Sequence, residues 1–277
     1  HDALPICVGL LIMTAIIFTD YMLIAEYAGY IYLVFMALLV ITLFFGKVVN
    51  GARSWIPIFS FGFQPSEFAK IATILYLAKF LSAKKERSNG QRFILAGLVV
   101  AVPMMLVLLQ PDMGTAVVFL PILLVMSYLA GIDARYIIYV LITGSLLIVL
   151  GVIPAWNLYV AERDIGLLRV LTAGNYAAYT LLVLGSIIAL SAIGYFLLKR
   201  RYFYWLLYGF SSLFVAYGGS FLLRLILKDF QIKRLIVFLD PTIEPQGAGW
   251  HVIQSVTAVG SGGFWGKGWL KGTQSHY

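Results

Sequence analysis

Eight long apolar runs occupy most of this chain and constrain its fold more than any other feature. A helix needs about 20 residues to cross the hydrocarbon core of a bilayer, and these runs are continuous, which favours helices over a β-barrel. With 61% hydrophobic residues, 12% charged residues and a mean hydropathy of +0.93, the chain lacks the polar shell of a soluble domain. The sequence therefore predicts an all-α, polytopic membrane protein with spans at about 5–25, 28–46, 66–82, 93–110, 115–131, 136–155, 177–198 and 203–227.

Two basic loops predict how the spans are oriented. Residues 82–92 and 198–202 are rich in Lys and Arg, so both should be cytoplasmic. Four predicted spans separate them, and an even number returns the chain to the same side. Residues 47–65, 110–114, 156–176 and everything after 227 are then expected outside. These cationic loops and contacts with anionic lipids account for the net charge of +8 without a nucleic-acid partner.

We expect a single membrane domain over 1–277 that is truncated at both ends, since the chain starts at His1 and stops at "SHY". Within it, 228–277 is expected to form an extracytoplasmic or re-entrant loop region. The lone Cys7 excludes a disulfide framework, and the three histidines are too scattered for a metal site.

Polar residues gather in "NGARSWIPIFSFGFQPSEFAK" (50–70), which glycines and prolines break into a structured loop. Ser66 is expected to cap the following helix, with Glu67 favourable in its first turn. Lys70 opposes the helix dipole and needs a partner. That partner is either Glu67, three residues earlier, or an anionic ligand group.

The stretch "QPDMGT" (110–115) predicts a helix boundary at the same outer end. Pro111 cannot continue the preceding helix, and Asp112 can cap the next one by accepting from the N–H of Gly114 or Thr115. A carboxylate at this mouth could also act as a base or as a cation ligand.

The region after 227 combines positive charge with glycine and tryptophan. Lys228, Lys233 and Arg234 leave the last span on the side that the positive-inside rule disfavours, which an anionic lipid-linked ligand or snorkelling to lipid phosphates would explain. "GAGWHVIQSVTAVGSGGFWGKGWLKGTQS" (247–275) is typical of a re-entrant or interfacial loop near an amphiphilic substrate. The alternative is a surface loop with no chemical role.

The same segments resemble the SEDS family (shape, elongation, division and sporulation). The matching blocks lie at about 45–131 and 229–277, and "GKGWLKGTQS" is similar to its RodA branch. The resemblance implies a bacterial peptidoglycan glycosyltransferase of the cytoplasmic membrane, with ten or more spans when intact. It would polymerise lipid II at the outer face for elongation and rod shape, with a class B penicillin-binding protein and other elongation proteins as partners. It implies no certain cofactor, although a divalent cation, Mg²⁺ or Mn²⁺, could assist.

The resemblance also implies functional positions. Trp55 falls on an important tryptophan after "GA", and Lys70 on the lysine that ends "QPSEFAK"; these two are expected to face ligand. The catalytic aspartate of the family is expected just beyond Tyr277, so no catalytic residue is assigned within this chain. The candidate substrate-binding residues are Arg53, Trp55, Glu67, Lys70, Asp112, Arg234, Asp240 and Gln254.

Two other functions remain open from the sequence. A lipid II flippase should carry polar residues through the bilayer midplane, often in paired repeats, whereas the polar residues here cluster at the outer mouth and no repeat is evident. A non-catalytic scaffold for a transpeptidase is the other alternative.

Overall fold

The structure, a computed structural model, describes residues 3–49, 51–58, 61–83, 88–156, 174–226, 237, 240–243, 245–247, 249–268 and 272. The chain divides into two compact units, 1–137 and 138–277, each described here by itself. Among the described residues, the helices long and apolar enough to cross a membrane are Tyr21–Phe45, Asn89–Leu109, Ala134–Ile153, Tyr176–Leu198 and Arg201–Arg224. The predicted class, a polytopic helical membrane protein, is confirmed, whereas a single membrane domain over the whole chain stays a prediction.

The helices agree with the predicted spans except at the start of the chain. Helix α1 (Ala3–Ile17) and helix α2 (Tyr21–Phe45) are separated at residues 18–20. The predicted boundary between 25 and 28 is therefore wrong. The physical reason is Asp20, whose Oδ1 accepts from the N–H of Met22 at 2.8 Å and caps α2. The apolar pattern continues across this break, so hydropathy alone did not reveal it.

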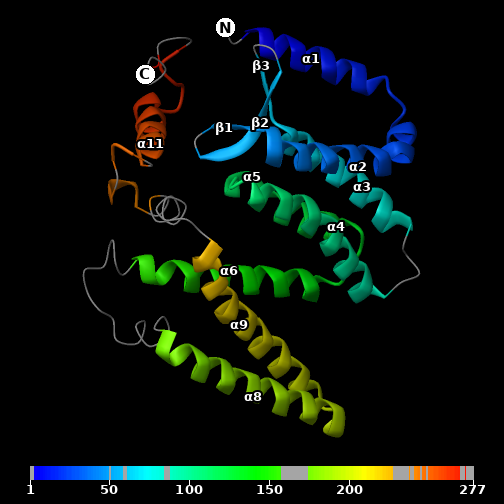
Figure 1. Cartoon of the computed structure of the whole chain (residues 1–277), viewed down its shortest axis with the longest axis vertical. Coiled ribbons are helices and arrows are strands. Elements are labelled where there is room, and N and C mark those ends of the chain that lie inside the picture. Colours follow the sequence, from blue (N-terminus) through cyan, green and yellow to red (C-terminus); the bar gives the residue numbers. More distant parts are fainter. Residues whose placement is uncertain are drawn as a thin grey trace. The chain divides into compact units, whose positions relative to one another are not determined.

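The first unit is built around a bundle of α2 with α3 (Pro65–Ala83), α4 (Asn89–Leu109) and α5 (Met113–Leu129), shown in Figure 1. The helix α5 has 17 residues and α3 carries three charged side chains, so neither meets the criteria for a span by length and apolarity. The count of eight spans is thus approximate. The core residues come from all four helices and include Leu39, Leu77, Val107 and Phe119, each fully buried. Tyr32 Oη donates to Val99 O at 2.7 Å and ties α2 to α4.

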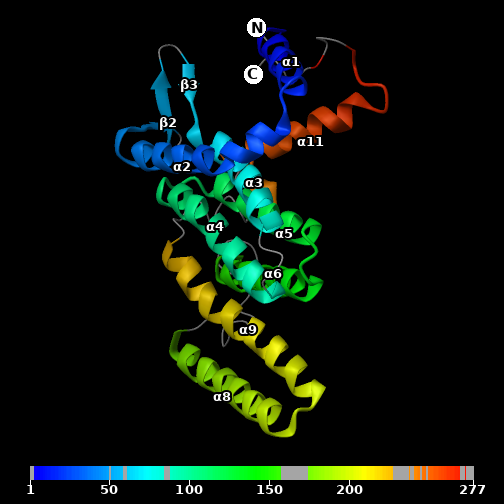
Figure 2. The same cartoon turned by 90° about the vertical axis from the view of Figure 1, so that its right-hand side faces the viewer.

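A small antiparallel sheet follows α2 where the sequence indicated only a structured loop. Its strands are β1 (Lys47–Val49), β2 (Ala52–Ile58) and β3 (Phe61–Phe63), in the order β1-β2-β3. Figure 2 shows β2 and β3 projecting to one side of α2. An aromatic run of Phe63, Phe68 and Phe35 fastens the sheet, because the Phe68 ring lies 5.0 Å from that of Phe63 and 5.8 Å from that of Phe35.

The second unit contains most of α6 (Ala134–Trp156), together with α8 (Gly174–Leu198) and α9 (Arg201–Ile226), which form a helical hairpin (Figure 1). A glycine on each of α6 and α9 makes room for a leucine side chain of the other helix. A Cβ on Gly151 would lie 2.7 Å from Leu223 Cδ2, and a Cβ on Gly219 would lie 2.7 Å from Leu147 Cδ1. Close approach through small residues is a usual way for apolar helices to associate in a membrane.

The region after α9 contains a short 3₁₀ turn, η2 (Pro241–Ile243), and helix α11 (Trp250–Gly262). The first half of 247–275 is thus helical, and a re-entrant or interfacial position for this region stays a prediction. The helix exposes apolar side chains such as Val256 and Val259. Glycines at both ends, including Gly249 and Gly263, obscure its boundaries in the sequence. The glycine-rich part agrees with a loop from Gly263, where the backbone turns to positive φ.

Candidate functional site

The small sheet places Trp55 over a glycine at one end of the first unit. Trp55 lies on β2 opposite Lys47, and its half-buried indole crosses the neighbouring strand at Gly62. A Cβ on Gly62 would come within 2.7 Å of Trp55 Cε3. Real Cβ contacts are not this short, so the absence of a side chain at position 62 makes room for the ring. Trp55 was a candidate substrate-binding residue from the sequence, but the packing of its ring against Gly62 was not predicted.

Arg53 fastens the sheet to two helix ends. Its backbone N–H donates to Gln110 O at 3.0 Å, and its Nη1 donates to Leu43 O at 3.3 Å in the last turn of α2. A cation at a helix C-terminus interacts favourably with the helix dipole. The side chain is exposed, so its charge also faces solvent. The structure therefore shows a structural role for Arg53, and its contact with substrate stays a proposal.

At the start of α3, the expectation that Ser66 caps the helix is wrong. The helix begins at Pro65, the favoured residue for a first helical position, and the N–H of Glu67 bonds Gln64 O. Ser66 is fully buried and its Oγ has no hydrogen-bond partner. A cap at Ser66 would start the helix at Glu67, two residues after its observed start at Pro65, and Ser is a stronger capping signal than Gln64.

Glu67 and Lys70 form the ion pair that their spacing predicted. Lys70 Nζ lies 2.9 Å and 2.8 Å from the two carboxylate oxygens of Glu67. The Lys70 side chain is 19% exposed and that of Glu67 is 51% exposed. Because one partner is half in solvent, the pair contributes little to stability. An anionic ligand could replace Glu67 at Lys70 with little disturbance to the fold.

Asp112 caps α5 as predicted. Its Oδ1 accepts from the N–H of Thr115 at 3.2 Å, while its Oδ2 accepts from Thr115 Oγ1 at 3.0 Å and from Gln64 Nε2 at 3.1 Å. Both carboxylate oxygens are therefore occupied within the protein. The bond from Gln64 ties the start of α3 to the start of α5.

Sequence reasoning missed two glutamines that hold this end together. Gln64 reaches Asp112 as described, and Gln110 is fully buried with its Nε2 donating to Leu39 O at 3.0 Å. Its Oε1 has no hydrogen-bond partner. Each glutamine directly precedes a proline and a helix start, in "QPSE" and "QPDM". That repeated Gln-Pro signal could have marked them.

The charged groups of the first unit lie near the helix ends. Among its described residues, Lys47, Arg53, Glu67, Lys70 and Asp112 belong to the end that carries the sheet. The others lie toward the opposite end: Asp20, Glu26, Lys79, Arg92, Asp133 and Arg135. The middle of the described bundle carries no ionisable Asp, Glu, Lys or Arg.

The remaining candidates belong to the second unit. Asp240 Oδ1 accepts from the N–H of Thr242 at 3.0 Å and from its Oγ1 at 2.6 Å. These bonds hold the pKa of Asp240 below its usual range, since they stabilise the carboxylate. Gln254 is on α11, with a buried Oε1 that has no hydrogen-bond partner. Arg234 lies outside the described residues.

The carboxylates of the described residues do not form a divalent-cation site. They contain no cluster of three or more His, Cys, Asp or Glu that could hold a metal. In the first unit, Glu67 is paired with Lys70 and Asp112 with Thr115 and Gln64. The protein groups described here therefore do not fit Mg²⁺ or Mn²⁺ as a resident ion, and we assign no step to one.

Comparisons with known proteins agree with the motifs. The FtsW/RodA/SpoVE family, described as cell cycle protein, matches residues 1–196 and 180–277. The chain is 40% identical over 269 residues to peptidoglycan glycosyltransferase RodA of Treponema pallidum, covering 97% of this chain and 62% of that protein. It is 28% identical over 270 residues to peptidoglycan glycosyltransferase MrdB of Escherichia coli K12, covering 98% of this chain and 54% of that protein.

Solved structures give weaker matches. A variant of the rod shape determining protein RodA of Thermus thermophilus is 24% identical with a TM-score of 0.48, covering 79% of this chain and 70% of that chain. A peptidoglycan synthase complex gives 24% identity and a TM-score of 0.46, covering 95% of this chain and 57% of that chain. The chain spans between half and two thirds of the length of the two curated relatives. The SEDS resemblance of the two sequence blocks agrees with this family match. The chain therefore belongs to the FtsW/RodA/SpoVE family of cell cycle proteins.

Proposed function

We propose that the protein is a peptidoglycan glycosyltransferase that polymerises lipid II at the outer face of the bacterial cytoplasmic membrane, for elongation and rod shape. The observation that carries this proposal is 40% identity to a relative named for that activity, along 97% of this chain. Because the chain covers 62% of that relative, the activity is proposed for the intact protein.

The distribution of charge supports chemistry at one face rather than transport. A pathway across the bilayer would place polar groups at its midplane, whereas the described ionisable groups of the first unit lie near the helix ends. The basic loops 82–92 and 198–202 would be cytoplasmic, which puts the sheet, Trp55 and Lys70 outside. The proposed acceptor and donor are both lipid-linked and meet at that face.

The proposed reaction needs a base and a cationic site. The acceptor hydroxyl attacks the anomeric carbon of the donor sugar, its proton passes to a general base, and the bond to undecaprenyl pyrophosphate breaks. Positive charge beside the departing pyrophosphate stabilises this step. We place the base outside this chain, on the aspartate that the family resemblance implies beyond Tyr277, because Asp112 and Asp240 already have internal hydrogen bonds.

Lys70 is the cation best suited to the pyrophosphate. It is mostly buried, near the start of α3, and Glu67, its ion-pair partner among the described residues, is half exposed. We propose that the pyrophosphate takes the place of Glu67, while Arg53 adds charge from β2 and Trp55 packs against the substrate at the lipid–water boundary. Arg234, Asp240 and Gln254, in the region after 227, are proposed as further substrate-binding residues.

The proposed partners are lipid II, a class B penicillin-binding protein that crosslinks the product, and other membrane proteins of the elongation machinery. Their support is the family membership alone.

The test is glycan synthesis by the full-length protein purified with its penicillin-binding partner. Fluorescent lipid II is supplied in detergent, and products are resolved on a gel with and without moenomycin. Glycan ladders that resist moenomycin are expected. A well-folded complex that makes no ladder would contradict the proposal, and a proteoliposome flipping assay would then distinguish a flippase from a scaffold.

A further inference from the structure

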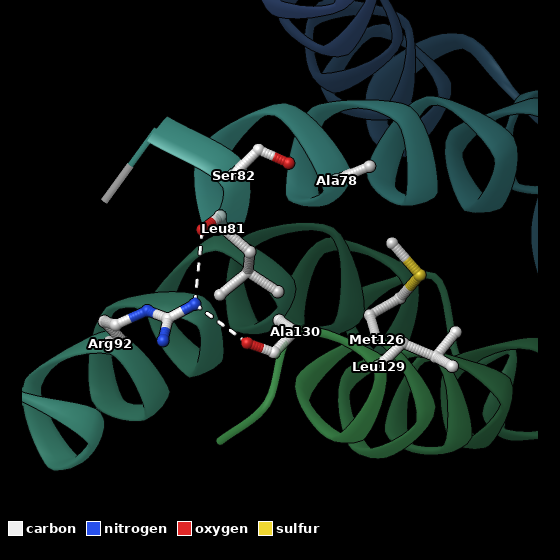
Figure 3. A pocket seen from close by; sticks show the side chains of 7 residues that line it. All are labelled: Ala78, Leu81, Ser82, Arg92, Met126, Leu129 and Ala130. Carbon is white, nitrogen blue, oxygen red and sulfur yellow. Dashed lines mark hydrogen bonds between the residues drawn. The ribbon is translucent and has the colours of Figure 1, made fainter. Parts of the chain in front are cut away.

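A second polar site lies at the end of the first unit that is opposite to the sheet. The last turns of α3, the first turn of α4 and the end of α5 line an open cavity of about 320 Å³ (Figure 3). Its lining consists of Ala78, Leu81, Ser82, Arg92, Met126, Leu129 and Ala130. Most of these side chains are apolar, and one carries a full positive charge.

Arg92 is an unusual residue for its position. It lies in the first turn of α4, where the helix dipole disfavours a cation, and it is only 6% exposed. Its Nη2 donates to Leu81 O at 3.3 Å and to Ala130 O at 3.1 Å, as Figure 3 shows. These two carbonyls belong to the C-terminal ends of α3 and α5, so the guanidinium caps two helices at once.

The carbonyls satisfy hydrogen bonds but do not neutralise the charge. Arg92 Nη1 makes only a long contact of 3.4 Å with Asn89 Oδ1, and its Nε has no hydrogen-bond partner. The described residues give Arg92 no carboxylate partner, since the nearby Asp133 is paired with Arg135. A buried cation normally has an anionic partner, because desolvation is costly without one. Within the part of the chain that the structure describes, the Arg92 guanidinium therefore has hydrogen bonds but no counter-charge.

The walls of the cavity indicate what kind of anion would fit. Small side chains at Ala78, Ser82 and Ala130 leave room beside α3, while Leu81, Met126 and Leu129 offer apolar surface. A free phosphate would lose its hydration against this surface and gain one cation. A phospholipid would place its phosphate on Arg92 and its acyl chain against the leucines and the methionine, which satisfies both parts of the cavity.

We propose that this cavity binds an anionic phospholipid of the cytoplasmic leaflet through an ion pair between its phosphate and Arg92. The sequence of loop 82–92, directly before α4, is rich in Lys and Arg, a composition typical of segments beside anionic headgroups. The lipid would complete the contacts that join α3, α4 and α5 at this end. The proposal uses the predicted cytoplasmic orientation of this loop and is independent of the glycosyltransferase proposal.

The test measures lipid binding by native mass spectrometry and by thermal unfolding of the full-length purified protein. Phosphatidylglycerol should remain bound and raise the unfolding temperature more than phosphatidylcholine does. Arg92→Gln should weaken phosphatidylglycerol binding about ten-fold, the effect of losing one hydrogen bond to a charged group. Binding of phosphatidylcholine should not change.

A second variant tests the cavity without touching the guanidinium, because Arg92→Gln also removes helix caps. Ala78→Phe should fill the cavity and displace phosphatidylglycerol, whereas Ala189→Phe, at an exposed alanine of α8, should not. Unchanged phosphatidylglycerol binding by a folded Ala78→Phe protein would overturn the site. Equal protection by inorganic phosphate in phosphatidylcholine would overturn the lipid as its ligand.

Discussion

Asp112 gives the sharpest test of whether a carboxylate at the outer end serves structure or chemistry. Replacing it by Ala removes the cap of α5 and two further hydrogen bonds, from Thr115 Oγ1 and Gln64 Nε2. Loss of a cap costs about 1 kcal/mol. Each of the other two bonds is half-buried and contributes about 0.5 kcal/mol. Asp112→Ala should therefore lower the free energy of unfolding by about 2 kcal/mol.

The Asn variant separates charge from capping. Asn caps helices as well as Asp does, and its amide can exchange donor and acceptor roles with Gln64 and with the Thr115 hydroxyl. Asp112→Asn should therefore change the free energy of unfolding by less than about 0.5 kcal/mol. If the carboxylate acts only through the fold, this variant should also retain lipid II polymerisation.

The measurements are unfolding of the purified protein in a denaturant titration and polymerisation of fluorescent lipid II. Asp20→Ala is the matched control, because Asp20 caps α2 with a single bond to Met22 and should cost about 1 kcal/mol or less. An Asp112→Ala protein no less stable than Asp20→Ala would refute the structural reasoning. A folded Asp112→Asn protein without polymerisation would show that the negative charge itself is required.

Three further predictions concern the other candidate residues. Lys70→Ala should abolish polymerisation while folded protein is retained in size-exclusion chromatography. The control is Lys79→Ala, at the other end of α3 and bonded to a backbone carbonyl, which should leave polymerisation unchanged. Equal glycan yields from the two variants would contradict the role of Lys70. Trp55→Ala should raise the lipid II concentration needed for half-maximal synthesis, and Gly62→Ala should do so more weakly by displacing the ring; an unchanged substrate dependence in both would exclude that contact. The hydrogen bonds from Thr242 keep the folded-state pKa of Asp240 below its usual value, so they stabilise the turn above about pH 4 and are lost as pH falls through that lowered pKa. Hydrogen exchange should therefore show constant protection of the Thr242 amide between pH 5 and 8. A loss of protection in that range would contradict the prediction.

The sequence predicted helices better than it predicted their ends. Apolar length identified each long helix of the described chain, because spanning a bilayer requires a continuous run. The break between α1 and α2 was not predicted, because Asp20 lies within a sequence that is mostly apolar on both sides. The cap at Ser66 predicted a start of α3 two residues late, because Ser is a common capping residue, yet here it is buried.

In the candidate site, too, some contacts could be predicted from the sequence and others could not. Local interactions could be predicted, including the Glu67–Lys70 pair at a spacing of three and the cap from Asp112 to Thr115. Contacts between distant segments could not be predicted, because no local period specifies them. The bond from Gln64 to Asp112 joins residues 48 apart, and that from Gln110 to Leu39 joins residues 71 apart.

These long-range bonds explain why the sheet, rather than a flexible loop, carries Trp55. The backbone carbonyl of Gln110 accepts a hydrogen bond from the N–H of Arg53. The side-chain Nε2 of Gln110 donates to Leu39 O in α2. Arg53 in turn bonds the end of α2. The sheet is thus fixed to the ends of α2 and α4, and Gln64 carries the same connection to α3 and α5. Such a frame fixes the half-buried ring of Trp55 in one position, and this preorganisation is what the proposed binding of a lipid-linked substrate at one membrane face requires.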